Sequence, residues 1–455
     1  MYRKKFMLML MLALTTQTSP AAVMTLEECR GMAVENNKEL RMADKSKEAA
    51  YYVRKSAFTA YLPKVSATGL YMHTGKELSL LSDEQKTTLS GLGDAVGIPA
   101  LNAAGQGLVD ALRTDTRNMA GAAVMLTQPL YTGGKIRAYN NIARHAERIA
   151  GNKREQKYQE LIADVDETYW NIVQLTARLR LAESYRDLVR TLDSDVEQMI
   201  DAGFATKADG LSVKVKVNEA DVTIIKVENG IELLKMRMCE ICGLPLDSDI
   251  TLADEDATAL PDMNECADIS PYAYEDRPEL SALGTAVRIY DEKVRLARAE
   301  YMPTVALTGG YFASYPSVFN SFEKKFKGTW NIGVAVNLPI LTWGDRTYKV
   351  KAAKAEAESA RLELEEVREK IELQVSQSRQ KVREAHERYA ASLSSQAEAD
   401  ENLRYATLGM KEGVIPVSNV IEAQTAWLAA KTNLLSADID LRLAYVYLRK
   451  ATGTI

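Results

Sequence analysis

The clearest pattern in the chain is an alternation of apolar residues with small or polar ones between positions 329 and 338. The apolar positions are Trp330, Ile332, Val334, Val336 and Leu338. The positions between them are Thr329, Asn331, Gly333, Ala335 and Asn337. A period of two residues places alternate side chains on opposite faces of a β-strand. The pattern therefore predicts a strand with one apolar face and one small, polar face.

Three further segments show a weaker form of this alternation and predict strands of similar length. They cover residues 64–73, 119–129 and 304–315. Strands of about ten residues match the length of a tilted strand that crosses a bilayer. Aromatic residues gather near the strand ends, as they do at the two interfaces of a membrane. They are Tyr131, Tyr311, Phe312, Tyr315, Trp330 and Trp343. A small hairpin sheet in a water-soluble protein is the alternative interpretation of the strands alone.

Two long helical patterns follow the strand pairs, at 135–202 and 345–412. In the second, apolar and small residues recur mostly at alternating spacings of three and four. They are Val350, Ala353, Ala357, Ala360, Leu364, Val367, Ile371, Val375, Ser378, Val382, Ala385 and Tyr389. This spacing predicts a coiled-coil-like seam, with one stutter at Ile371–Val375. At 1.5 Å per residue, each helix is roughly 100 Å long. A long helix in a filament or a coiled-coil dimer shares this pattern.

Each long helical pattern ends at a glycine, Gly203 or Gly413, and a second amphipathic pattern resumes at once. Return helices are predicted at 204–242 and 414–452. A return helix of roughly 58 Å and the roughly 36 Å helix predicted at 38–61 together match one long helix in length. We therefore expect one long helix to run antiparallel beside two short ones. The glycine breaks are then hairpin tips far from the strands.

The same order of elements occurs twice, so the chain is a tandem repeat. AYLPKVSATGLY at 60–71 aligns with EYMPTVALTGGY at 300–311. LTQPLYTGGKIRAY at 126–139 aligns with VNLPILTWGDRTYK at 336–349. From Pro129 and Pro339 onward the offset stays constant, which indicates a constraint on length.

The repeat predicts three regions and one connecting segment that is longer in the first repeat than in the second. The regions are a first repeat, an acidic linker and a second repeat, at 22–242, 243–260 and 261–455. The segment 74–118 is expected to be a loop, longer than its counterpart in the second repeat. Residues 22–37 and the linker are expected to form a belt where the short helices meet.

The N-terminus has the features of a secretory signal peptide. Cations at 3–5 precede an apolar run at 6–14 that is too short to span a bilayer, and Ser19 and Ala21 fit cleavage after Ala21. Removing residues 1–21 takes away three cations and no acid, so the net charge falls from −5 to −8. This acidic balance argues against nucleic acid as a partner. Because no other run of about 18 apolar residues exists, we expect an exported chain that is periplasmic, secreted or a membrane β-barrel.

Two copies of a helix–strand–strand–long helix–return helix unit resemble the TolC family of outer-membrane efflux proteins, the outer membrane factors. The most specific matches are GVIPVSNVIEAQTAWLAAKTNLLSA after the second tip, the strand-closing QPLYTGG and LPILTWG, and the paired YLP and YMP. The resemblance covers nearly the whole mature chain. It implies a mainly α-helical fold in which a homotrimer builds a 12-stranded membrane β-barrel, continued by a periplasmic α-helical barrel.

The function implied by the resemblance is a passive outer-membrane channel of a tripartite efflux or type I secretion system, exporting small molecules or polypeptides. The implied partners are outer-membrane lipid, a periplasmic adaptor (membrane fusion) protein and an inner-membrane pump of the RND or ABC type. The residues favour such an assembly independently, because four strands cannot close alone and an open sheet edge is not tolerated in lipid. Cyclic assembly solves this problem.

A periplasmic coiled-coil scaffold or adaptor without a pore is the alternative. It gives no reason for four alternating strands with aromatic ends.

The resemblance also assigns roles to residues near the two tips. Carried over by position, the surface that docks the adaptor consists of Gly203, Phe204, Thr206, Asp209, Gly413, Val414, Ile415 and Pro416. The family's two acidic pore-constriction positions fall on Asn419 and Glu422, of which only the second is acidic here. A basic residue that latches neighbouring protomers in the family falls on Ile415, so that latch is not expected.

The sequence offers no catalytic, metal or cofactor site. The CxxC at 239–242 has no second CxxC, and a structural helix end explains it. Cys29 and Cys266 occupy equivalent positions in the two repeats, and a disulfide between them is one option in an oxidising compartment. The acidic run at 247–256 lacks the glycine and spacing of an EF-hand. The three histidines are isolated from any catalytic motif: His73, His145 and His386.

Overall fold

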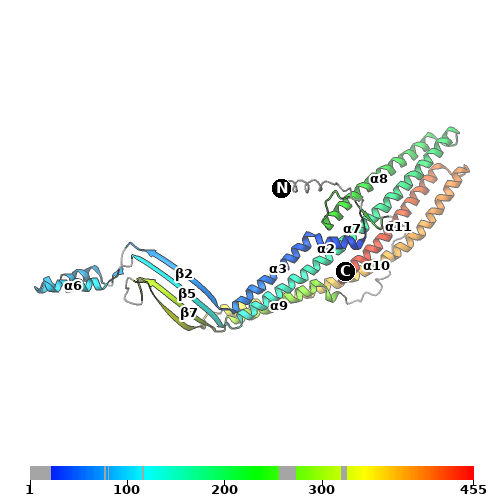
Figure 1. Ribbon diagram of the computed structural model, residues 1–455. Helices are drawn as coiled ribbons and strands as arrows, with labels where there is room; N and C mark the ends of the chain where they lie inside the picture. Colours follow the sequence, from blue (N-terminus) through cyan, green and yellow to red (C-terminus); the bar gives the residue numbers. More distant parts are fainter. Residues whose placement is uncertain (1–21, 76–77, 80, 115–116, 256–272, 319–324) are drawn as a thin grey trace, which may run out of the picture. The chain divides into compact units, whose positions relative to one another are not determined.

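The structure is a computed structural model that describes most of the chain (Figure 1). The described residues are 22–75, 78–79, 81–114, 117–255, 273–318 and 325–455. The predicted signal peptide, residues 1–21, lies outside them, as do Cys266 and the end of the predicted linker, residues 256–260. Within the described part, no helix combines the length and apolar character that crossing a bilayer requires.

The chain divides into two compact units. The helical unit comprises residues up to 49, 148–286 and 361–455. The sheet unit comprises residues 50–147 and 287–360. Each unit draws on both sequence repeats, because each repeat contributes strands to one unit and a helical hairpin to the other.

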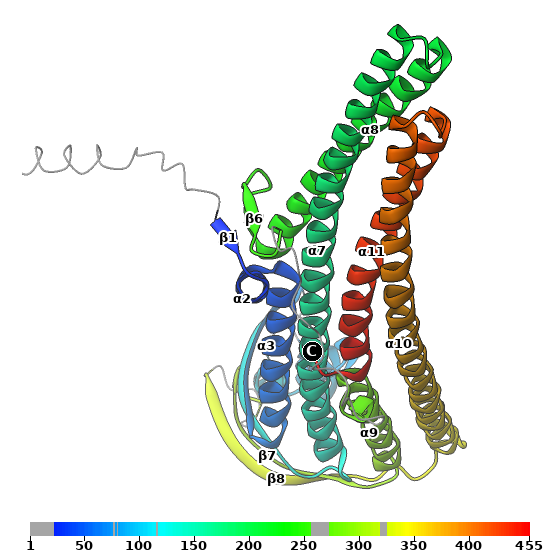
Figure 2. The ribbon, with the colours of Figure 1, turned by 90° about the vertical axis from the view of Figure 1, so that its right-hand side faces the viewer.

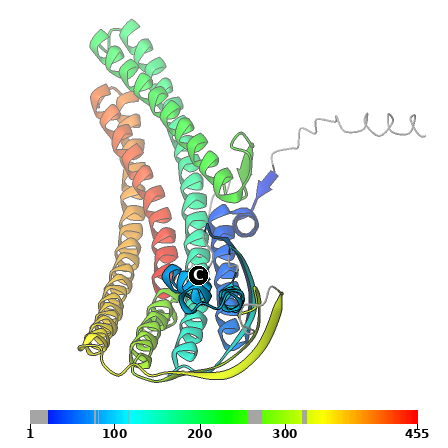
Figure 3. The ribbon, with the colours of Figure 1, turned by 90° about the vertical axis from the view of Figure 1, so that its left-hand side faces the viewer.

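The sheet unit contains a four-stranded antiparallel sheet with strand order β2-β5-β7-β8, which forms a curved layer in Figure 3. Its strands are β2 (Lys64–His73), β5 (Asn118–Tyr131), β7 (Thr304–Tyr315) and β8 (Lys327–Asn337). β5 pairs with β7, so the strand pair of one repeat joins that of the other. β2 and β8 are the two edges of the described sheet.

One face of this sheet is apolar across all four strands. The register pairs Val65 with Leu126, Val124 with Tyr311, and Tyr311 with Trp330. Paired residues of antiparallel strands share a face. The apolar face therefore contains Val65, Ala67, Tyr71, Ala120, Ala122, Val124, Leu126, Val305, Leu307, Tyr311, Trp330, Ile332, Val334 and Val336. The opposite face is mostly small and polar, with Ser66, Thr68, Ala123, Thr127, Thr308, Asn331, Gly333 and Asn337, but it also contains Leu70, Met72, Met119, Met125 and Phe312. In the single chain, Trp330 retains 73% of its accessible surface.

The segment 74–118, expected to be a loop, is largely helical, and that expectation was wrong. It contains α4 (Asp83–Ser90), α5 (Leu92–Val96), α6 (Ala100–Ala111) and the paired strands β3 (Leu78–Ser79) and β4 (Arg113–Thr114). Ser82 and Gln85 form a capping box that starts α4. A Cβ atom on Gly105 would lie 1.8 Å from the carbonyl oxygen of Leu89, so this glycine permits close packing of helices rather than a turn.

Long and short helices make up most of the rest of the described chain. They are α2 (Leu26–Asn36), α3 (Lys38–Phe58), α7 (Lys135–Asp201), α8 (Lys207–Cys242), α9 (Pro278–Ala299), α10 (Asp345–Lys411) and α11 (Val417–Thr452). Short 3₁₀ turns lie at Thr59–Tyr61 and Ala273–Asp276. α7 and α10 have 67 residues each. The return helices α8 and α11 begin three residues later than the sequence pattern indicates, because the residues after each glycine form a turn.

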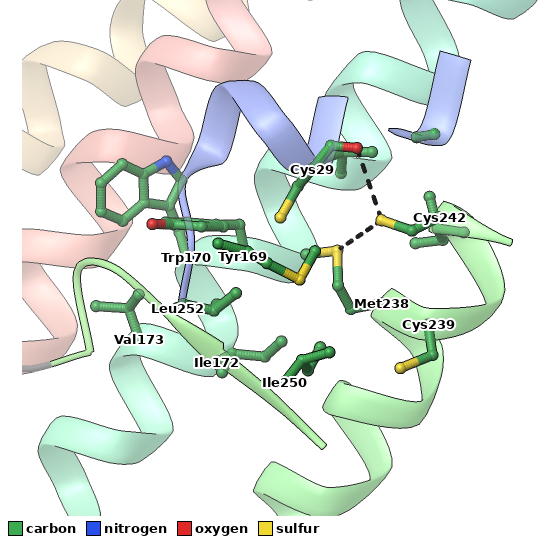
Figure 4. Close-up of a cluster of buried hydrophobic side chains, with 14 of the residues drawn as sticks. Cys29, Tyr169, Trp170, Ile172, Val173, Met238, Cys239, Cys242, Ile250 and Leu252 are labelled. Atoms are coloured by element: carbon green, nitrogen blue, oxygen red, sulfur yellow. Dashed lines mark hydrogen bonds between the residues drawn. The ribbon is translucent and has the colours of Figure 1, made fainter. Parts of the chain in front are cut away.

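The N-terminal segment packs against the end of α8 in the helical unit, which forms the described part of the expected belt. β1 (Ala22–Met24) pairs in parallel with β6 (Ile250–Leu252). Met24, Ile250 and Leu252 of this pair belong to a buried cluster that also includes Cys29, Tyr169 and Met238 (Figure 4). The Tyr169 hydroxyl donates a 2.6 Å hydrogen bond to Asp254. These contacts fix the short N-terminal helix α2 beside the base of the first hairpin.

Candidate functional site at the hairpin tips

Two helical hairpins carry the residues assigned to docking and gating. α7 and α8 form the first and α10 and α11 form the second, and Figure 2 shows their tips at the same end of the helical unit. A shared core beneath the tips holds the hairpins together. Its buried members are Tyr185, Val189, Leu192, Val196, Val213, Ala220, Ala406, Met410, Val417, Val420 and Ala423. All four helices contribute to it, so the tips are held together by packed side chains.

The first tip is closed by a left-handed glycine and a capping box. Gly203 has φ +80°, and the N–H of Phe204 donates a 2.7 Å bond to the carbonyl of Met199. This is a Schellman ending, which favours glycine because a Cβ atom is strained at such a φ. Thr206 then caps α8. Its N–H and hydroxyl donate to the Asp209 carboxylate at 2.9 and 2.6 Å, and its hydroxyl accepts the N–H of Asp209 at 3.2 Å.

The carboxylate of Asp209 therefore has a structural role. Hydrogen bonds from the Thr206 hydroxyl and backbone N–H lower the pKa of Asp209, because both stabilise the charged form. The side chain keeps its charge while it satisfies groups at the start of α8. A partner at this tip would meet a carboxylate that is already hydrogen-bonded.

The second tip has the same backbone path but a different cap. Gly413 has φ +71°, and Val414 donates a 2.8 Å bond to the carbonyl of Gly409. Pro416 is the N-cap of α11 and provides no side-chain hydrogen bond. Ile415 packs directly on Gly409. A Cβ atom added to Gly409 would lie 2.5 Å from Cδ1 of Ile415.

The two tips exchange large and small residues at equivalent positions. The first has Met199 opposite Ala205, and the second has Gly409 opposite Ile415. The family's latch position is thus occupied by a half-buried side chain that packs within its own tip. This exchange was visible in the sequence as a reciprocal change between the two repeats, but sequence reasoning missed it.

Each tip exposes one large apolar side chain. Phe204 retains 82% of its accessible surface and Val414 retains 79%. They occupy equivalent positions in the two repeats, immediately after the left-handed glycines. The eight residues assigned to docking thus separate into two exposed apolar groups and six residues that build or flank the turns.

Three comparisons with known proteins identify relatives of this chain. Residues 30–232 and 270–454 match the family model "Outer membrane efflux protein". The chain belongs to the outer membrane efflux protein family. The outer membrane efflux protein BepC of Brucella suis is 24% identical over 347 residues, which span 75% of this chain and 73% of that protein. The outer membrane protein TolC of Vibrio cholerae is 21% identical, with 97% and 94% covered.

A solved structure agrees with these relatives at the level of the fold. The crystal structure of the outer membrane protein VceC from Vibrio cholerae superposes with a TM-score of 0.75 at 14% identity, covering 94% of this chain and 96% of that chain. The predicted resemblance to the TolC family is therefore confirmed. This efflux protein is a component of the outer membrane that extends into the periplasm, and it is not an enzyme.

The two positions assigned to the constriction of this efflux protein lie in the first turns of α11. Asn419 and Glu422 are both exposed and are three residues apart, so they share a helix face. Val417, Val420 and Ala423 are buried in the core beneath the tips. The pair therefore lies on the side of α11 that faces away from this core.

A polar network between α10 and α11 escaped the sequence analysis. Trp427 Nε1 donates a 2.5 Å hydrogen bond to Asp400, and Lys431 Nζ and Gln396 Nε2 each lie 3.2 Å from the same carboxylate. Burial opposes the charge on Asp400, but hydrogen bonds from these three side chains outweigh it and lower its pKa. The signal in the sequence was Trp427 and Lys431, spaced by four on one helix face.

The CxxC of α8 does not form a reactive pair. Cys29, Cys239 and Cys242 are buried and free. The Cys239 thiol faces the carbonyl oxygen of Ser248 at 3.8 Å. Within the described residues, no cluster of three or more His, Cys, Asp or Glu side chains is arranged to hold a metal ion.

Proposed function

We propose that three copies of this efflux protein assemble into a passive export duct. In this arrangement the sheets close into one 12-stranded barrel in the outer membrane, and the hairpins form a hollow helical cylinder in the periplasm. The duct performs no chemistry. An inner-membrane pump of the RND or ABC type supplies the energy, and a periplasmic adaptor connects the pump to the hairpin tips. The cargo is small molecules or polypeptides.

The single observation that carries this proposal is the sheet with one apolar face and two open edges. β2 and β8 each have an unpaired side in the described sheet. Unpaired backbone groups in lipid cost several kcal/mol each, so an open edge cannot face hydrocarbon. If β8 of one copy pairs with β2 of the next, the backbone groups of both edges are hydrogen-bonded. Repeating this contact by rotational symmetry closes a ring.

In this arrangement the apolar face of the sheet contacts the lipid of the outer membrane. Its exposed side chains, Trp330, Ile332, Val334 and Val336 among them, form a contiguous surface that is unfavourable in water. In a closed barrel this face contacts lipid, while the small and polar face lines the lumen. A lumen with such a lining selects weakly, which suits a duct whose cargo is chosen by the pump.

The hairpin tips supply the docking surface in this proposal. Phe204 and Val414 offer two exposed apolar contacts per protomer, so a trimer presents six in a ring. Asn419 and Glu422, in the first turns of α11, line the narrowest part of the pore near these tips.

Two measurements on purified protein test the proposal. Native mass spectrometry in mild detergent should give a trimer, and planar bilayers should show steady single-channel conductance. A monomer without conductance contradicts the proposal. A trimer that binds membranes but carries no current favours a scaffold over a duct.

A further inference from the structure

Cys29 and Cys242 meet in the core of the belt, although 213 residues separate them in the chain. Cys29 lies in the first turns of α2, and Cys242 is the last residue of α8. Both side chains are completely buried. The Cys242 thiol lies 3.6 Å from the carbonyl oxygen of Cys29 and 3.7 Å from the sulfur of Met238 (Figure 4).

The backbone holds these two segments at close range. Gly243, directly after Cys242, has φ +72°, and a Cβ atom there would lie 2.6 Å from the Cβ of Asn36 at the end of α2. On the other side of α2, β1 pairs residue by residue with β6. Because both flanks of α2 are fixed, the backbone holds the segment of Cys29 beside that of Cys242.

The surroundings select Cys29 as the partner of Cys242 among the described cysteines. Cys239 lies one helical turn earlier, but its thiol faces the carbonyl oxygen of Ser248. The proximity of the two residues lowers the pKa of Cys29, and this proximity together with burial raises the pKa of Cys242. The Cys242 thiol faces the backbone of Cys29, and both residues belong to the same buried cluster.

We propose that Cys29 and Cys242 are joined by a disulfide bond in the mature protein. This efflux protein is exported beyond the inner membrane, where thiols are oxidised and disulfides persist. The bond would link α2 covalently to the base of the first hairpin. It would close a loop of more than 200 residues and so restrict the unfolded chain strongly.

The oxidant is a periplasmic protein that carries a reactive disulfide. A thiolate of one cysteine attacks that disulfide and forms a mixed disulfide, and the thiolate of the other cysteine then displaces the oxidant. One S–S bond forms in this chain and one breaks in the oxidant. The two electrons and two protons leave the two thiols and produce two thiols on the oxidant. Since thiolates are the nucleophiles and the folded core raises the pKa of Cys242, the exchange takes place while the chain folds.

Peptide mapping of the wild-type protein tests this linkage directly. Cells are quenched in acid, thiols are alkylated under denaturing conditions, and the chain is digested with trypsin and a protease that cleaves after glutamate. Cleavage after Glu240 separates Cys239 from Cys242, so a linked pair is assigned without ambiguity. We expect a peptide containing Cys29 joined to one containing Cys242, and two more alkylated cysteines after reduction than before. Four free thiols, or a link from Cys29 to Cys266 instead, overturns the proposal.

Thermal unfolding gives a second, independent measurement. Adding reductant should lower the unfolding midpoint of the wild type by several degrees. It should have no effect on the double variant Cys29→Ala/Cys242→Ala. The matched control Cys239→Ala removes a buried cysteine from the same helix and should respond to reductant as the wild type does. Equal midpoints with and without reductant in the wild type contradict a bond that stabilises this belt.

Discussion

At the scale of single residues, the two tips solve the same problem with different side chains. A left-handed glycine ends each long helix, but only the first tip then uses a capping box. Thr206 and Asp209 satisfy each other there, whereas Pro416 and Asn419 hold the equivalent positions. Equivalence between repeats therefore does not imply equivalent roles. Asp209 is primarily a helix cap, and its assignment to docking stays a prediction.

Removing the cap at Asp209 should loosen the first tip. Asp209→Ala deletes two acceptor contacts at the start of α8 and should cost about 1 kcal/mol of local stability. Hydrogen exchange of the amides just after Thr206 should accelerate severalfold. Asn419→Ala is the matched control, because no side-chain cap exists there, and it should leave exchange at the second tip nearly unchanged.

This cap should also respond to pH in a defined direction. Hydrogen bonds to the charged form place the pKa of Asp209 below its unfolded value. Its contribution is therefore complete above the unfolded pKa of about 3.9 and is lost as the pH falls through the folded pKa. Relative to Asp209→Asn, the wild-type tip should lose its extra protection only in that acidic range. Loss near neutral pH would show that another group is responsible.

Glu422 is the residue on which ion selectivity should depend. In a trimer, three copies of this exposed carboxylate approach the pore axis, repel one another and attract cations. Wild-type channels in planar bilayers should be cation-selective and blocked from the periplasmic side by trivalent cations. Glu422→Gln should weaken that block markedly. Glu365→Gln, which changes an exposed carboxylate in the middle of α10, is the control and should leave the block unchanged. If the Glu422 variant is blocked as strongly as the wild type, Glu422 is not part of the constriction.

At the scale of elements, each hairpin presents an apolar side chain at the end of a rigid pair of helices. Phe204 and Val414 lie on turns anchored by the shared core beneath the tips, so their positions are well defined. Exposed apolar groups held this way are suited to contact another protein.

Replacing these two groups should disrupt docking without unfolding the hairpins. Phe204→Ala/Val414→Ala removes apolar surface that is exposed in the single chain, so the thermal midpoint should hardly change. A photo-crosslinking residue at position 204 or 414 should give an adduct with a periplasmic adaptor in living cells, and the same residue at Leu362, exposed in mid-helix, should not. Resistance to exported compounds should fall in the double variant and not in Leu362→Ala.

The main elements could be predicted because their signals are local and repeated. The alternation of apolar and polar residues at 329–338 predicts a strand. Pro339 and the turn at Gly344 predict where that strand ends. The long helices follow from the three-four spacing of small residues, and the tips from glycines that recur at one offset. The helices in 74–118 were not predicted, because the glycines of this segment favoured a loop, whereas Gly105 permits close packing of helices. The docking and constriction residues came from the family resemblance, and local spacing alone would not have found them.

At the scale of the whole molecule, the proposed duct has a defined orientation. The segment with α4 to α6 connects β2 and β5, and the hairpin tips lie at the far ends of the long helices. If both strands enter the membrane from the helical side, the α4–α6 segment faces the cell exterior and the tips face the periplasm.

Cysteine labelling on intact cells tests this orientation. Glu84→Cys, on the exposed side of α4, should react with an impermeant maleimide. Val414→Cys should react only after the outer membrane is permeabilised; position 414 is preferable to Gly413, whose left-handed φ would strain a new side chain. Native cysteines are replaced first, and that cysteine-free background is the control for unspecific labelling. Reaction at both sites on intact cells would refute the topology.

The two open strand edges have a consequence for the life of the chain before assembly. A newly exported copy has an exposed apolar face, and the edge strands beside it have unpaired backbone N–H and C=O groups. Such edges can pair with other chains and promote aggregation. If the proposed trimer forms, the survival of this copy depends on how quickly two other copies arrive, or on a periplasmic chaperone that covers the edges until then. Because closure of the proposed barrel requires three chains at once, productive assembly should fall steeply as expression falls. Overproduction without chaperones should instead divert the chain into insoluble material.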